Sequence, residues 1–145
     1  AMWWIYFSLS AERASERLLH SDKTGQMGRL VYTYVHFLLI AAIVLVAVAD
    51  EFVLAHAHGH VSIATLVAVI GGPALYLAGN ILFKTLMFNS HPRSHYIGLI
   101  LLGLLIPLSS ALSPVVLGVS TTAILVLVAC WETLAVLKSD AATST

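Results

Sequence analysis

The feature that most constrains this chain is a continuous apolar stretch over residues 30–54, LVYTYVHFLLIAAIVLVAVADEFVL. In a helix with about 1.5 Å of rise per residue, roughly 20 apolar residues cross the ~30 Å hydrocarbon core of a bilayer. The stretch therefore predicts a membrane-spanning helix. Its strongly polar residues are His36 near the start and Asp50 and Glu51 near the end. Because an ionisable group inside a membrane costs about a few kcal/mol unless it faces protein or water, we expect a stripe of the helix to face its neighbours. At about 100° per residue, that stripe holds Tyr32, His36, Ile43, Ala47 and Asp50, with Glu51 beside it.

The composition extends this prediction to the whole chain of 145 residues, of which 59% are hydrophobic and 10% are charged. Soluble domains carry about 25% charged residues, so the chain is predicted to be an integral membrane protein. Hydropathy predicts an all-α, polytopic transmembrane bundle with one partial N-terminal span and four complete ones. The expected spans are residues 1–19 (partial), 30–54, 62–88, 96–112 and 115–137, followed by a disordered tail over 139–145.

The basic residues predict how the bundle is oriented. With the spans above, all seven Lys and Arg fall at the same side of the membrane, which the positive-inside rule assigns to the cytoplasm. The N-terminal end is then expected outside and the C-terminal tail inside. The formal net charge is zero, which argues against a nucleic-acid partner, because such proteins carry a concentrated basic surface.

Four polar side chains are expected near the cytoplasmic ends of three different spans: His36, Asn80, Lys84 and Glu132. Their similar depth indicates either a polar pocket or proton path, or a structural ion pair with Lys84 extending to the lipid headgroups. Together with Asp50 and Glu51, these residues are the candidate substrate or proton pathway. No catalytic residues and no cofactor are predicted.

The third span is interrupted by Gly71-Gly72-Pro73. Broken helices mark binding sites in many transporters, whereas small residues at helix spacing are what close helix packing requires. Thr65, Ala68, Gly72 and Gly79 form such a stripe, so packing with a kink is the favoured interpretation and a binding site is the alternative.

A loop between two spans carries His56, His58 and His60. Imidazoles suit zinc, copper and nickel, but alternating histidines on a short loop are not a specific zinc spacing. We therefore predict no metal site, with these three histidines as weak candidates.

Three segments resemble the bacterial low-temperature-requirement A (LtrA) family: WWIYF at residues 3–7, YTYVHF at 32–37 and GGPALYLAGNILFK at 71–84. In this resemblance Ser8 replaces an acidic residue that is often present in the family. The resemblance implies a polytopic protein of the bacterial inner membrane whose further N-terminal helices are missing here. The resemblance identifies family signature positions in this chain but implies no role for them. They are Trp3, Trp4, Tyr6, Phe7, Tyr34, His36, Gly71 and Gly72.

Three classes of function remain open from the sequence. The first is a transporter or channel-like protein that moves a small solute, an ion or protons and supports growth in the cold. The second is a structural or sensory membrane protein whose buried polar residues only fix helix packing. The third is a membrane enzyme near the histidine loop; because no catalytic motif is present, we expect that the protein is not an enzyme. Membrane lipid and the missing N-terminal helices are the expected partners, and a homo-oligomer is a further alternative.

Overall fold

The computed structural model describes residues 2, 31–57, 60–88 and 91–143. This part of the chain consists of helices and short connections and contains no strand. Four helices are long and apolar enough to cross a membrane, over Thr33–Ala55, Ile63–Leu86, Arg93–Ala111 and Pro114–Ala135. The predicted all-α fold with four complete spans is therefore confirmed. The partial N-terminal span lies outside the described residues, except for Met2.

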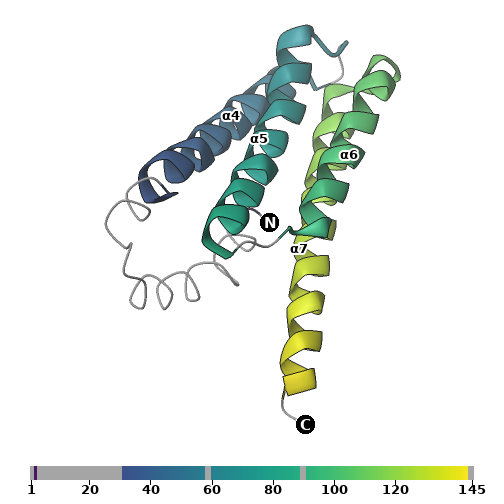
Figure 1. Ribbon diagram of the computed structural model, residues 1–145. Helices are drawn as coiled ribbons and strands as arrows, with labels where there is room; N and C mark the ends of the chain where they lie inside the picture. Colours follow the sequence, from purple (N-terminus) through teal and green to yellow (C-terminus); the bar gives the residue numbers. More distant parts are fainter. Residues whose placement is uncertain (1, 3–30, 58–59, 89–90, 144–145) are drawn as a thin grey trace.

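The helices follow one another in an up-and-down arrangement (Figure 1). A short π-helix, η1 (Val31–Val35), leads into α4 (His36–Ala55), which is followed by α5 (Ile63–Phe88). Next come α6 (Arg93–Leu108), the 3-10 turn η2 (Ser109–Ala111) and α7 (Pro114–Thr143). Helix α5 is central, because it packs against α4, α6 and α7. It is also the most buried of the four.

Local signals in the sequence explain where these helices begin. The Ser62 hydroxyl accepts a hydrogen bond from the Thr65 amide at 3.1 Å, which caps the first turn of α5. Ser113 accepts one from the Val116 amide at 3.4 Å, and Pro114 stands at the first position of α7, where proline's missing N–H costs nothing.

Two of the expected helix boundaries are corrected. Helix α6 begins at Arg93, so His95 lies in its first turn and not in the preceding loop. Helix α7 continues to Thr143, although the sequence predicted a disordered tail from residue 139. No Gly or Pro interrupts the chain after Leu137, and Ala141 and Ala142 are strong helix formers, so the last turns extend beyond the other helices (Figure 1).

The predicted inward stripe of α4 is wrong. The buried side chains near and on this helix are Val35, Leu39, Ala42 and Ala49, whereas Ile43 is 50% exposed. Asp50 and Ala47 are exposed as well. The helix is apolar on every side, and close packing in a membrane depends on small side chains such as Ala42 and Ala49. The positions of its polar residues therefore did not determine which face packs against α5.

The packing interpretation of the glycines in α5 is supported. The helix continues through Pro73, and Thr65, Ala68, Gly72 and Gly79 are all buried. A Cβ atom at Gly72 would stand 2.7 Å from Cγ2 of Val46 and 3.1 Å from its backbone nitrogen, on α4. The absence of a side chain at this position is what lets the two helices approach so closely.

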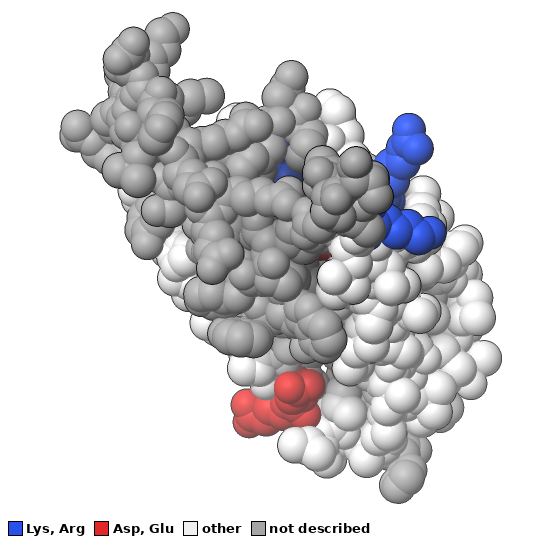
Figure 2. Space-filling model, turned by 90° about the horizontal axis from the view of Figure 1, so that it is seen from below, with Lys and Arg blue, Asp and Glu red and all other residues white. Residues whose placement is uncertain are grey.

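Charged side chains are few on the surface of the residues that the structure describes. Seen from below, exposed basic atoms and a group of acidic atoms lie apart on the described surface (Figure 2). Such an apolar exterior is expected of helices that face lipid.

Candidate functional site

Three charged or ionisable side chains meet between α5, α6 and α7, and we call them the charged cluster: Lys84, His95 and Glu132. The ammonium of Lys84 donates a hydrogen bond to Oε1 of Glu132 in an ion pair. The other carboxylate oxygen, Oε2, lies 3.7 Å from Nε2 of His95. The Glu132 carboxylate thus links α7 to α5 through Lys84 and lies close to His95 of α6.

The topology of the bundle explains why these residues meet. Each lies about one turn or less from the end of an apolar span: Lys84 before Leu86, His95 after Arg93 and Glu132 before Ala135. Because successive helices run in opposite directions, these three ends fall on the same side of the bundle (Figure 1).

The charged cluster is shielded from its surroundings. His95 is 0% exposed, and the side chains of Lys84 and Glu132 are 8% and 14% exposed. A buried charge is tolerated when it is paired, and the Lys84–Glu132 pair meets this condition. The hypothesis that Lys84 extends to the lipid headgroups is wrong, because its side chain turns inward to Glu132.

Polar neighbours hold part of the cluster in place. The Ser94 hydroxyl lies 3.1 Å from Nδ1 of His95, which fixes the imidazole on one side. One turn before Lys84 on α5, Asn80 is fully buried and donates from Nδ2 to the Tyr76 carbonyl at 2.9 Å. Three buried atoms in this region have no hydrogen-bond partner among the described residues: Asn80 Oδ1, His95 Nε2 and Glu132 Oε2. Unsatisfied acceptors of this kind can take up a proton or a donor group.

Sequence reasoning identified Asn80, Lys84 and Glu132 but missed His95. The signal for His95 was Pro92, which stands a few residues before a long apolar run and marks a helix start. A helix that begins there places His95, Gly98 and Leu102 on one face, and all three are buried. His36 is partly buried at the start of α4, directly after the π-helical turn η1, and its place in one polar pathway with Glu132 stays a prediction.

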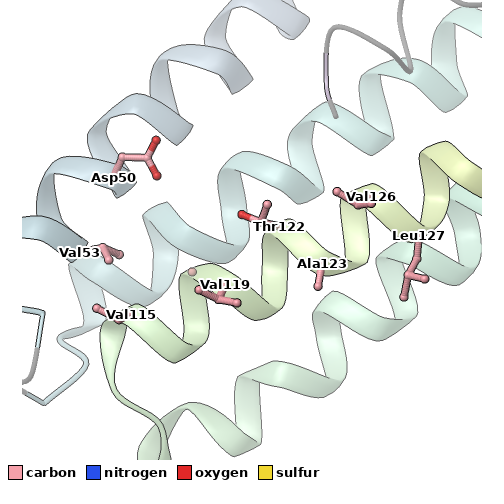
Figure 3. A pocket seen from close by; sticks show the side chains of 9 residues that line it. Asp50, Val53, Val115, Val119, Thr122, Ala123, Val126 and Leu127 are labelled. Atoms are coloured by element: carbon pink, nitrogen blue, oxygen red, sulfur yellow. The ribbon is translucent and has the colours of Figure 1, made fainter.

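Asp50 and Glu51 lie far along α4 from its start and are both exposed. Asp50 lines a groove of about 660 Å³ between α4 and α7. Its carboxylate and the hydroxyl of Thr122 face the same space from the two helices (Figure 3). Glu51 does not line the groove.

The histidine loop is only partly described. His56 and His60 are exposed, and His58 lies outside the described residues. Within the described part of the chain, no group of three or more His, Cys, Asp or Glu is placed to hold a metal ion. A site that includes all three histidines stays a weak hypothesis.

Most of the chain matches a known protein family. Residues 1–130 match the family described as bacterial low temperature requirement A protein (LtrA). The chain belongs to the LtrA family.

Of the LtrA signature positions, the structure places four. Tyr34 lies in η1 and is 71% exposed, and His36 follows it in α4. Gly71 and Gly72 lie in α5, at the contact with α4. The remaining positions, Trp3, Trp4, Tyr6 and Phe7, lie outside the described residues.

A relative of this LtrA chain is an uncharacterized protein of Rhizobium meliloti (strain 1021), which is 32% identical over 131 residues. The match covers 90% of this chain and 32% of the relative, so the chain spans about a third of the relative's length. No solved structure matches the chain.

Proposed function

We propose that this LtrA chain forms part of a multi-pass protein of the bacterial inner membrane that moves a small solute in a process coupled to protons. The observation that carries the proposal is the charged cluster, in which Glu132 pairs with the ammonium of Lys84 while its other oxygen, Oε2, lies 3.7 Å from the imidazole of His95. The family description adds the expectation that this activity supports growth at low temperature.

The chemistry of the cluster supports a proton-dependent switch. While Glu132 is ionised, its charge holds Lys84 and so links α7 to α5. A proton that reaches Glu132 through His95 removes the negative charge and leaves the ammonium without its counter-ion. Because an unpaired charge in a low-dielectric site is costly, the protonated state favours a rearrangement of α5 against α7. Two states of this kind are what a proton-coupled carrier requires.

The energetics of buried ion pairs also favour a role beyond packing. Apolar residues of similar volume often stabilise a buried site as well as an ion pair does, because each charge loses its hydration. A charged cluster of three groups is thus a poor choice for helix packing alone. One observation favours the structural or sensory alternative. The close contact at Gly72 fixes α4 against α5, as expected of helices that do not move relative to each other.

The double variant Lys84→Met/Glu132→Leu distinguishes the carrier proposal from the structural or sensory alternative. It removes both charges together, so the bundle should keep most of its stability. A carrier should nevertheless lose proton uptake into liposomes under an imposed membrane potential, and a strain that depends on this gene should lose growth in the cold. A structural protein of unchanged stability should keep that growth. Normal proton uptake and normal cold growth in a stable double variant would contradict the carrier proposal.

The proposed orientation places the charged cluster near the cytoplasm. It is supported by the basic residues Lys84, Arg93 and Lys138, which belong to the same end of the bundle, while the connections at the opposite end, 55–62 and 109–114, contain no Lys or Arg.

Labelling with a membrane-impermeant maleimide tests this orientation in a Cys130→Ser background. In intact spheroplasts, cysteine at the exposed position His60 should react, and cysteine at the exposed position Lys138 should react only after the membrane is permeabilised. The opposite pattern would reverse the orientation.

A further inference from the structure

The groove between α4 and α7 has the composition of a binding site for an organic molecule. Its volume of about 660 Å³ falls in the usual range of small-molecule sites. Its walls are almost wholly apolar and include Val53, Val115, Val119, Val126 and Leu127. The exceptions are the Asp50 carboxylate on one wall and the Thr122 hydroxyl on the other (Figure 3).

Asp50 has no cationic partner among the described residues. It lies five residues before Ala55, the end of its span, which places it about 7–8 Å inside the apolar part of α4. A carboxylate at such a depth is costly unless a cation or water meets it. In the described part of the chain, the ion pair of Lys84 with Glu132 involves no other carboxylate, and Asp50 takes part in none.

A smaller pocket of about 40 Å³ lies beside Asp50, between α4, α5 and α7. Val69, Pro73 and Thr121 line it together with Asp50 and Thr122. Because proline has no N–H, the carbonyl of Val69, four residues earlier in α5, lacks its usual helical donor. The pocket is too small for an organic molecule but large enough for a head group about the size of a water molecule.

We propose that the groove binds a small amphipathic molecule with a single primary ammonium group. The ammonium donates to Asp50 and Thr122 at the mouth of the smaller pocket, and the apolar body lies along the valine and leucine walls. An ammonium has three donors, and the polar side chains that line the groove, those of Asp50 and Thr122, can both accept a hydrogen bond. This inference rests on the proposed transport function and names the substrate class.

The apolar walls and the lack of basic residues in the groove distinguish the proposed ligand from two other cationic ligands. A sodium ion would use the oxygen atoms near Asp50 but would leave the long apolar groove without a function. An aminophospholipid has the same head group, yet its ammonium is attached to a phosphate, for which the groove lining offers no basic residue.

Equilibrium dialysis of the purified chain in detergent, with radiolabelled phenethylammonium as the probe, tests the proposal. We expect saturable binding that Asp50→Asn weakens about tenfold or more, the loss typical of a charge-assisted hydrogen bond. Thr122→Val should weaken it a few-fold. Glu51→Gln, which removes the neighbouring exposed carboxylate outside the groove, should leave the affinity unchanged. The neutral analogue 2-phenylethanol should not compete.

Four outcomes would overturn the assignment. They are the absence of saturable binding, an equal loss in Glu51→Gln, competition by sodium as effective as that by unlabelled phenethylammonium, and loss of binding in nanodiscs of phosphatidylethanolamine but not of phosphatidylcholine. Circular dichroism shows whether each variant is folded, so that affinities are compared only between folded proteins. Because dialysis requires no transport, binding that persists in a chain without proton uptake keeps this inference and removes only the carrier proposal.

Discussion

Replacing Lys84 with methionine should lower the free energy of unfolding by about 3–5 kcal/mol, the usual cost of removing one partner of a buried ion pair. The variant leaves Glu132 ionised and largely buried, and the nearest other described group that can carry a positive charge is His95, at 3.7 Å from Oε2. Methionine resembles lysine in length and fills most of its space, so the loss reports the missing charge and not a cavity. Unfolding of the purified chain in mixed micelles with sodium dodecyl sulfate, followed by circular dichroism, measures the effect.

Two further variants make this measurement specific. Lys138→Met removes a basic residue that is exposed and should change stability by no more than about 0.5 kcal/mol. The double variant Lys84→Met/Glu132→Leu should recover most of the loss, because no unpaired charge remains. If the stability lost in the double variant, relative to the unmodified chain, equalled the sum of the losses in Lys84→Met and Glu132→Leu, the two side chains would not be coupled and the ion pair would not hold α5 to α7.

The number and approximate position of the spans could be predicted from the sequence because hydropathy is a property of each segment alone. A segment such as 62–88 must cross the membrane whatever it packs against, and the helix observed there is Ile63–Phe88. The shared depth of Lys84 and Glu132 followed from the same reasoning. An ion pair was one of the two alternatives for these residues, and the sequence could not decide between them, since contact depends on how each helix is rotated about its axis.

The rotation of the helices is where the sequence was least informative. In α4 the polar residues suggested an inward stripe, yet Ala42 and Ala49 are buried and Asp50 is exposed. Amphipathic patterns identify the packed face of a helix in water, but in lipid both faces are apolar and small residues decide which face packs. His95 was missed for a simpler reason: its helix was expected to begin at residue 96, and a residue in a loop has no helical face.

The small-residue contact between α4 and α5 leads to the second large expected effect. Replacing Gly72 with alanine should destabilise the bundle by about 1–3 kcal/mol, the range found when extra methyl groups are forced into a packed core. The added Cβ would meet Val46 Cγ2 at 2.7 Å, which requires a shift. It would also stand 3.1 Å from the Val46 backbone nitrogen, and a backbone atom cannot move aside without displacing α4 itself. Gly72→Leu should therefore be more damaging still.

The adjacent glycine provides the matched control for this prediction. At Gly71 the added Cβ would have its nearest contact with Leu45 Cδ2 at 3.7 Å, an ordinary van der Waals distance. Both substitutions give the same gain in helix propensity, up to about 1 kcal/mol, so the difference between them isolates the steric term. Gly71→Ala should be neutral or slightly stabilising in the same unfolding measurement. Equal stability of the two alanine variants would mean that α4 can move away from α5 at little cost, and close packing at Gly72 would then not be what fixes these two helices together.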